Sequence, residues 1–481
     1  MTSEYSSAIV AAFSRIAATR RHDALLVSPV RQASFDDVER FSVAIADRIR
    51  AAALKRGFPI ALSAHNGPAF LAGVLALRRT GHVPLLLDPF APIADRERAA
   101  AAIGAAAMVS CATGWPDSAA EFDITSLQPA AEVSLPDEVA AVKLTSGSTG
   151  TPRGVAMTES QLLSDENALA RTMGILADDR LLCTLPLSHS YGFTTCALAA
   201  LVRGLCLVLP ADDGPFAPLA AAQQLSATVF PTAPMYLQAL LRMSQPPAWP
   251  ASIRLVISAG AVLSPKTAAE FRRTFGQPVH VFYGSSECGG ICYDRDGGAA
   301  ARGTVGTPVD GVEISLSPSA SGDEADGLLI VRSAAVGVSY LPLPDRRLRD
   351  GHFETMDLAG WQAGELRLKG RADSVINLRG KKVDPSEVER VIAALPGVDE
   401  AVVFAVAAPD GAEIVRAVVA STSGDLNYAR VAAWCRDRLA PHKVPRSIIV
   451  VDEMPRTARG KIDRMALVKI GSAPDVSTAR G

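Results

Sequence analysis

Short apolar runs alternate with longer amphipathic stretches over most of this chain. Residues 181–185, 254–258 and 279–283 have the length and composition of buried strands, and alanine-rich segments such as 217–225 have a helical pattern. Strands that alternate with helices in this way pair as parallel sheets covered by helices. The pattern predicts an α/β fold in which residues 1–370 form a large N-terminal domain of helix-flanked, mostly parallel sheets.

A smaller region of different character follows residue 370. Asp384-Pro385-Ser386-Glu387 is typical of a helix start, because aspartate caps the N-terminus while proline and glutamate suit the first and third helical positions. The region also contains three strand-like runs and one helical stretch: 398–405, 414–420, 447–451 and 428–439. We expect residues 375–481 to form a small α+β domain.

Composition excludes several function classes. The net charge of −2, without a basic block, argues against nucleic acid or an anionic membrane as a partner. The N-terminus lacks the pattern of a signal peptide, and the longest apolar stretch, 193–210, contains Arg203 and is too short to span a bilayer. Cys288 and Cys292 have no second pair to complete a zinc site. We therefore expect a cytoplasmic protein with reduced thiols.

Residues 144–155, Leu-Thr-Ser-Gly-Ser-Thr-Gly-Thr-Pro-Arg-Gly-Val, are rich in glycine and hydroxyl groups. From Ser146 to Gly154 there are three glycines, four hydroxyl side chains and one cation, Arg153. Glycine lets the backbone approach a ligand closely and adopt positive φ without strain. The P-loop and Rossmann patterns are both absent, so a nucleotide bound here would be held by another design.

The flanks of this loop support phosphate binding. The apolar run 139–144 predicts a strand before it, and Thr158 with Gln161 predicts a capping box that opens a helix after it. In the order strand, glycine-rich turn, helix, backbone N–H groups can point at phosphate oxygens. We interpret the segment as a polyphosphate loop; the alternative is a flexible turn.

Five further motifs and one aspartate follow in order: Pro186-Leu-Ser-His-Ser-Tyr-Gly-Phe193, Tyr283-Gly-Ser-Ser-Glu287, Gly303-Thr-Val-Gly-Thr-Pro308, Asp357, Gly370-Arg-Ala-Asp-Ser-Val-Ile-Asn-Leu-Arg-Gly380 and Pro455-Arg-Thr-Ala-Arg-Gly-Lys-Ile-Asp463. Together with the loop, these segments resemble the adenylate-forming superfamily. That superfamily includes acyl- and aryl-CoA synthetases, adenylation domains of peptide synthetases and beetle luciferase, and the chain is most similar to its acyl-CoA synthetase-like members.

The resemblance implies a ligase that uses ATP, Mg²⁺ and CoA. A carboxylic acid attacks ATP to give an acyl-adenylate and pyrophosphate, and a thiol then displaces AMP. Both first reactants are anionic, and two unit charges 4 Å apart repel by about 4 kcal/mol at an effective dielectric of 20. Lys461 is the expected cation between them, Glu287 the Mg²⁺ ligand, Ser286 the α-phosphate contact and His189 a residue at the acid.

The resemblance also implies two sets of binding residues. For ATP these are Thr145, Ser146, Gly147, Ser148, Thr149, Gly150, Thr151, Arg153, Gly154, Gly260, Ala261, Tyr283, Gly284, Asp357 and Arg371. For the acyl group they are Tyr191, Gly192, Phe193, Thr232, Ala233, Ser258 and Ala259.

Three positions depart from the family pattern. Arg153 replaces the usual loop lysine and presents a planar fork in place of a point charge. Ser286 replaces a threonine and retains the hydroxyl, and Met356 replaces the flexible glycine before Asp357. None of these changes removes a functional group that the chemistry needs.

Thioester formation requires a second arrangement of the small domain, because Lys461 and the incoming thiol compete for one cleft. Family members rotate this domain about a hinge, which corresponds to residues 371–374 with Asp373 at its centre. The turn Arg379-Gly380-Lys381 corresponds to the loop that enters for thioester formation. We therefore expect the small domain to be mobile.

The identity of the acid and of the acceptor stays open. The segment Ser188–Tyr191 lacks the aspartate that peptide-synthetase domains use to hold an α-ammonium group, which favours a neutral acyl or aryl acid. CoA is the expected thiol, and a carrier protein's phosphopantetheine arm is the alternative. The alternative to an enzyme is a regulatory protein that binds a nucleotide without catalysis. The sequence also leaves open whether the protein forms a homodimer.

Overall fold

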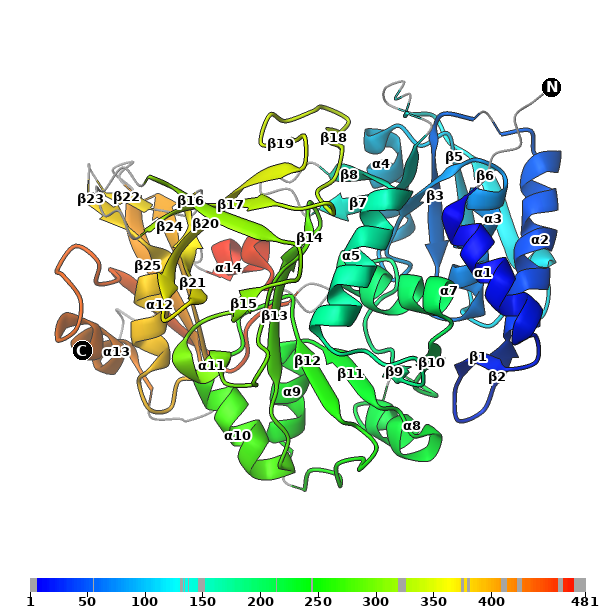
Figure 1. The fold of residues 1–481 in the computed structure, drawn as a ribbon. Helices are drawn as coiled ribbons and strands as arrows, with labels where there is room; N and C mark the ends of the chain where they lie inside the picture. The colour runs from blue at the N-terminus through cyan, green and yellow to red at the C-terminus, as the bar shows by residue number, and fades with distance from the viewer. Residues whose placement is uncertain are drawn as a thin grey trace. The chain divides into compact units, whose positions relative to one another are not determined.

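The computed structural model of the chain describes residues 7–470 except 55, 130–132, 134, 137, 146–151, 213, 244, 319–325, 373–375, 379–380, 408–412, 422–425 and 457–461. The chain divides into two compact units. The first unit comprises Met1–Ser315, Ile330–Glu354 and Gln362–Leu366, and the second comprises Leu316–Leu329, Thr355–Trp361 and Arg367–Gly481. Figure 1 shows the course of the chain through both.

A nine-stranded sheet forms one half of the first unit. Its strands, in spatial order, are β15 (Thr307–Pro308), β14 (Gly289–Tyr293), β13 (His280–Ser285), β12 (Leu255–Ser258), β11 (Val229–Thr232), β9 (Arg180–Leu182), β10 (Cys206–Val208), β1 (Ala24–Val27) and β2 (Gln32–Ser34). The six strands from β13 to β1 pair in parallel, while β14, β15 and β2 are antiparallel additions at the edges.

A seven-stranded sheet forms the other half. Its order is β18 (Ser339–Leu341), β8 (Arg153–Thr158), β7 (Val139–Thr145), β4 (Val83–Leu86), β3 (Pro59–Ala64), β5 (Ala107–Cys111) and β6 (Phe122–Ser126). The four central strands, β7 to β5, are parallel, and the flanking pairs are antiparallel. Parallel strands require helical crossovers, which explains the alternating pattern in the sequence.

Helices cover both sheets of the first unit. They are α1 (Ala8–Thr19), α2 (Phe35–Ala51), α3 (Pro68–Arg79), α4 (Ile93–Ile103), α5 (Glu159–Thr172), α6 (Ser190–Gly192), α7 (Ala199–Arg203), α8 (Ala217–Leu225), α9 (Pro234–Leu241), α10 (Pro265–Phe275) and α11 (Ala299–Arg302), with a π-helix at Phe193–Leu198 and a 3₁₀ turn at Ala119–Glu121. Helix α5 contacts β14 of one sheet and both β7 and β8 of the other (Figure 1).

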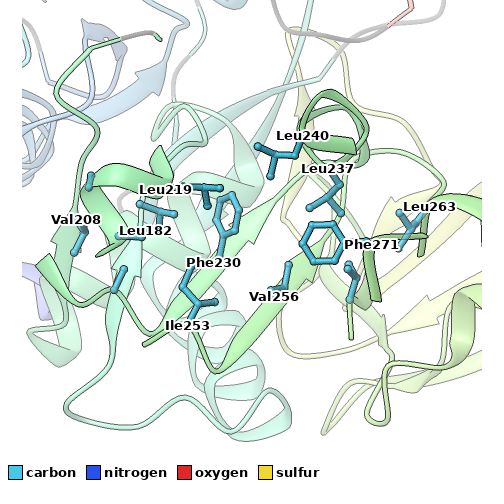
Figure 2. Close-up of a cluster of buried hydrophobic side chains, with 14 of the residues drawn as sticks. Leu182, Val208, Leu219, Phe230, Leu237, Leu240, Ile253, Val256, Leu263 and Phe271 are labelled. Carbon is cyan, nitrogen blue, oxygen red and sulfur yellow. The ribbon is translucent and has the colours of Figure 1, made fainter. Parts of the chain in front are cut away.

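The nine-stranded sheet carries a large apolar cluster that anchors helices α8 to α10. Phe230 of β11 is fully buried, and its ring lies 5.5 Å from Tyr236 and 6.4 Å from Trp249 between centroids. Figure 2 shows Phe230 beside Leu219 and Ile253. Burial of a whole aromatic ring is among the larger contributions that a single side chain makes to the stability of a core.

The second unit contains a three-stranded sheet, β24 (Glu400–Ala407), β25 (Glu413–Ala420) and β26 (Ser447–Val451), and a hairpin, β22 (Ile376–Leu378) with β23 (Lys381–Val383). Its helices are α12 (Pro385–Ala393), α13 (Tyr428–Arg436) and α14 (Arg464–Ile470). Asp384 caps α12 by accepting from the Ser386 N–H, as predicted. The remaining strands form a five-stranded sheet: β16 (Glu313–Pro318), β17 (Asp326–Arg332), β20 (His352–Gln362), β19 (Leu348–Arg349) and β21 (Glu365–Arg371).

The predicted α/β fold class is confirmed, and one local prediction is wrong. A strand, β8, stands between the phosphate loop and the helix that was expected to follow it directly. Arg153–Thr158 has the apolar character to pair antiparallel with β7, so the loop joins two strands of a hairpin and does not end at a helix N-terminus. The predicted capping box of Thr158 and Gln161 is present, and α5 begins at Glu159.

Two features of the described residues bear on membranes and metals. None of the described helices is both long enough and apolar enough to traverse a lipid bilayer. Within the same residues, no group of three or more histidine, cysteine, aspartate or glutamate side chains is arranged to hold a metal ion.

Candidate active site

The ends of the phosphate loop are held by the β7–β8 hairpin. Thr145 pairs with Arg153 in the ladder, and the Thr145 hydroxyl donates to the Arg153 carbonyl at 3.3 Å. A Cβ on Gly154 would lie 2.5 Å from Cγ1 of Val142, so this position requires glycine. The predicted residues Ser146, Gly147, Ser148, Thr149, Gly150 and Thr151 lie outside the described residues.

Arg153 has two partners in the first unit. Its guanidinium lies 3.8 Å above the centroid of the Tyr340 ring, and Nη2 is 3.3 Å from Oδ2 of Asp345. Asp345 also binds Arg347 at 2.7 Å. Hydrogen bonds from Arg347, with a smaller contribution from Arg153, hold the pKa of Asp345 well below its usual range. Burial of the carboxyl group opposes this shift.

The Tyr283–Glu287 motif forms the end of β13 and the turn into β14. Tyr283, Ser286 and Glu287 are partly buried, whereas Gly284 is exposed. Oε1 of Glu287 accepts a hydrogen bond from the Tyr340 hydroxyl at 3.0 Å, and the Glu287 carbonyl accepts from the Gly337 N–H at 2.8 Å.

Two buried charges lie behind this turn. Asp165 of α5, 2% exposed, accepts from the Gly290 N–H at 3.0 Å and from the Thr194 hydroxyl at 3.1 Å. Lys143 of β7, 1% exposed, donates to the same hydroxyl at 3.4 Å. Burial lowers the pKa of Lys143 and raises that of Asp165, while each charge opposes the shift of the other.

The Pro186–Phe193 segment places its side chains in different environments. Nε2 of His189 is 3.6 Å from Oδ2 of Asp88, which is itself buried. The Tyr191 hydroxyl donates to the Ile257 carbonyl at 3.3 Å, and burial raises the pKa of this phenol. Phe193 is 1% exposed and packs edge-on against Phe70, with 6.4 Å between ring centroids.

The remaining residues that were predicted to line an acyl pocket lie at the carboxyl ends of β11 and β12. Thr232 and Ser258 are paired in the ladder and are both 1% exposed, and Ser258 Oγ has no hydrogen-bond partner among the described residues. Ala233 precedes α9, and Ala259 follows β12. Gly260, with φ of +85°, turns the chain toward Ala261. This is the edge at which parallel sheets bind ligands.

The second unit holds the other predicted groups. Nη1 of Arg371 donates to Oδ1 of Asp357 at 3.1 Å, and the Asp357 N–H donates to Thr355. Of Lys381, only the backbone in β23 is described. Four predicted residues, Asp373, Arg379, Gly380 and Lys461, lie outside the described residues.

The residues that sequence reasoning missed are Tyr340, Asp345, Lys143 and Asp165. Lys143 carried a visible signal, because a lysine within the apolar run 139–144 implies a buried charge that needs a partner. Tyr340 and Asp345 carried none, since their contacts to Arg153 and Glu287 join segments that are far apart in the sequence.

The chain is similar to known proteins in sequence and in fold. The family described as "AMP-binding enzyme" matches residues 13–341, and its C-terminal domain family matches residues 387–461. A feruloyl-CoA synthase of Amycolatopsis is 28% identical over 461 residues, covering 89% of this chain and 92% of the relative. An oxalate–CoA ligase of Arabidopsis thaliana is 30% identical, covering 69% of this chain and 67% of the relative. ATP-bound MatB from Rhodopseudomonas palustris superimposes with a TM-score of 0.82 at 24% identity, covering 96% of this chain and 98% of that structure.

Proposed function

Because the chain belongs to the AMP-binding enzyme family, as an AMP-forming ligase of the acyl-CoA synthetase type, we propose that it joins a neutral acyl or aryl acid to CoA. The acid attacks the α-phosphorus of ATP, giving an acyl-adenylate and pyrophosphate. The CoA thiol then attacks the acyl carbon, forming the thioester and releasing AMP.

One observation carries the proposal. Arg153, which ends the phosphate loop, and Glu287, which ends the tyrosine motif, both contact the side chain of Tyr340. Two motifs that are far apart in the sequence therefore meet in the first unit. A cation and a carboxylate in contact with one tyrosine suit a phosphate group and its metal ion, respectively.

Mg²⁺ fits the residues present. This ion is usually bound through one or two carboxylates together with substrate phosphates, and not by a cage made of protein alone. The partly buried Glu287 supplies such a carboxylate. Glu287 would hold the ion; when bound, Mg²⁺ neutralises phosphate oxygens and makes pyrophosphate a better leaving group.

The chain's own residues position the nucleotide. In the proposal, the hydroxyls of residues 146–151 and the guanidinium of Arg153 hold the β- and γ-phosphates, and Ser286 holds the α-phosphate. Tyr283 stacks on adenine, and Asp357, oriented by Arg371 at 3.1 Å, accepts from the ribose hydroxyls. Catalysis is then mostly positioning and charge stabilisation.

Lys461 and the hinge complete the proposal. The Lys461 ammonium lies between the acid and the α-phosphate during adenylation and lowers their mutual repulsion. Rotation about Asp373 then exchanges Lys461 for the loop Arg379-Gly380-Lys381, and CoA enters. Lys461, Asp373, Arg379 and Gly380 lie outside the described part of the chain, as does the side chain of Lys381. Their roles rest on the sequence motifs.

The acid is proposed to be neutral apart from its reacting carboxylate. Asp88 is the described carboxylate nearest to the motif histidine, and it already faces His189 at 3.6 Å and accepts from the Phe90 N–H at 3.0 Å. It is therefore engaged within the protein and not presented to a substrate ammonium. The named relatives act on chemically different acids, feruloyl and oxalate, so the acid must be identified by experiment.

The test is ATP–pyrophosphate exchange with a panel of benzoates, cinnamates, fatty acids, dicarboxylic acids and α- and β-amino acids. We expect exchange with at least one neutral acid. In Lys461→Ala the exchange rate should fall by about a hundredfold to a thousandfold, the range for removing a group that stabilises developing charge. Exchange with no acid would refute the ligase assignment and favour a regulatory nucleotide-binding protein. Thioester formation from the identified acid is then measured with CoA and with a phosphopantetheinylated carrier protein. The faster acceptor identifies the thiol that the enzyme uses.

A further inference from the structure

Tyr340 is a buried residue that joins two elements of the proposed ATP site. It lies on β18 at the edge of the seven-stranded sheet, opposite Val155 of β8, and is 5% exposed. Its hydroxyl donates to Oε1 of Glu287 at 3.0 Å, while its ring faces the Arg153 guanidinium at 3.8 Å. One side chain thus contacts both the carboxylate and the cation.

Packing fixes the segment that carries Tyr340. The Gly337 N–H donates to the Glu287 carbonyl at 2.8 Å, so the same segment holds Glu287 by its backbone as well as by its side chain. A Cβ on Gly337 would lie 2.6 Å from Cγ1 of Val155, which means that the close approach to β8 requires glycine. Tyr340 is therefore presented to Glu287 by a tightly packed strand.

The ring of Tyr340 also gives a physical reason for arginine at position 153. A planar guanidinium stacks on an aromatic face and still forms directed hydrogen bonds at its edge, whereas an ammonium is a point charge. Nη2, at the edge of the Arg153 guanidinium, lies 3.3 Å from Oδ2 of Asp345. The same carboxylate oxygen lies 2.7 Å from Nη2 of Arg347. The guanidinium is oriented before any phosphate arrives.

We propose that Tyr340 is a positioning residue for adenylation: its hydroxyl holds Oε1 of Glu287 so that Oε2 takes Mg²⁺, and its ring orients Arg153 toward the phosphates. The inference rests on the proposed function. It assigns Tyr340 no contact with substrate and no part in bond making.

The hydrogen bond from the Tyr340 hydroxyl to the Glu287 carboxylate is of the charge-assisted kind, which is stronger than a neutral one.

The test measures metal binding directly. Mn²⁺ is used in place of Mg²⁺, together with the non-hydrolysable α,β-methylene analogue of ATP. Electron paramagnetic resonance then measures the free and bound fractions of Mn²⁺. Tyr340→Phe removes the hydroxyl and keeps the ring beside Arg153. Tyr236→Phe is the matched control, because it removes a hydroxyl that donates to the Pro215 carbonyl at 3.2 Å elsewhere in the first unit.

We expect Tyr340→Phe to weaken Mn²⁺ binding about tenfold, as loss of a hydrogen bond to a charged group predicts, and Tyr236→Phe to leave it within about twofold. In a Glu287→Gln background the further change Tyr340→Phe should have no effect on Mn²⁺ binding, because the carboxylate it positions is gone. Equal Mn²⁺ affinity in wild type and Tyr340→Phe would overturn the inference, even if the variant melts at a lower temperature.

Two further comparisons complete the design. Arg153→Lys keeps the charge and loses the stacked plane, so the KM for ATP should rise several-fold with little change in Mn²⁺ affinity; an unchanged KM would refute the role of the ring. Failure of the proposed function appears separately, as absence of pyrophosphate exchange in the wild type with every acid. If Tyr340→Phe does not fold, Tyr340→Met is judged by the same tenfold criterion.

Discussion

Replacing Lys143 by methionine should expose how the buried charges behind the active site are balanced. Lys143 and Asp165 are 1% and 2% exposed, and the Thr194 hydroxyl stands between them, accepting at 3.4 Å and donating at 3.1 Å. Methionine fills much of the lysine volume, so the main cost is a buried carboxylate without its cation. Breaking a buried pair costs about 3–5 kcal/mol, and because the threonine separates the charges we expect about 3 kcal/mol.

A double-mutant cycle tests this reasoning. Asp165→Asn should also cost about 3 kcal/mol, since it leaves a buried ammonium, although the amide oxygen can still accept from Gly290. In the double variant neither charge remains, so the cost should lie below either single cost and well below the sum of about 6 kcal/mol. The assay is urea unfolding followed by tryptophan fluorescence, using the transition that belongs to the first unit. Additive costs would refute the coupling.

The stability cost of Lys143→Met should depend on pH. Burial already raises the pKa of Asp165, and removal of Lys143, which opposes that shift, raises it further. A carboxylate whose pKa is higher in the folded than in the unfolded state stabilises the fold below the unfolded value of about 3.9, and this stability is lost as pH rises through the folded value. The cost of Lys143→Met should therefore be smaller at pH 5 than at pH 7.5. An equal cost at both pH values would mean that Asp165 is not the group left unbalanced.

Three further predictions address the core, an ion pair and the hinge. Phe230→Ala, at a fully buried ring, should cost about 3–5 kcal/mol in urea unfolding, whereas Phe216→Ala, 47% exposed, should cost less than about 1 kcal/mol; equal costs would refute the assignment of Phe230 to the core. Burial would raise the pKa of Asp179, but hydrogen bonds from Arg254, Thr228 and Leu176 lower it overall. The Asp179 carboxylate therefore stabilises the fold above its unfolded pKa, and this stabilisation is lost as pH falls through its folded pKa. Arg254→Met should cost about 2 kcal/mol at pH 7 and raise the midpoint pH of acid unfolding, and an unchanged midpoint would contradict this. Asp373→Pro should preserve pyrophosphate exchange and reduce thioester formation at least tenfold, because proline fixes φ at the proposed hinge; equal loss of both half-reactions would count against a hinge there.

Much of the candidate site could be proposed from the sequence because its residues are adjacent in the chain. The phosphate loop, the tyrosine motif and the capping box of Thr158 with Gln161 each depend on residues within a few positions of one another, and local spacing carries their chemistry. The strand β8 was missed for a related reason. A capping box reports where a helix begins, at Glu159, and says nothing about whether the preceding residues pair with β7.

The sequence by itself determined the α/β class and the family, and it supplied the proposal for the groups that face the nucleotide, since apolar periodicity and motif spacing are properties of the chain alone. Tertiary structure decided which side chains support those groups. Tyr340 contacts Glu287 and Arg153 because β18 pairs with β8 and Gly337 bonds the Glu287 carbonyl, and Asp165 receives the Gly290 N–H because α5 packs against β14. Such contacts join residues far apart in the sequence through strand register and close packing, and no local pattern encodes either.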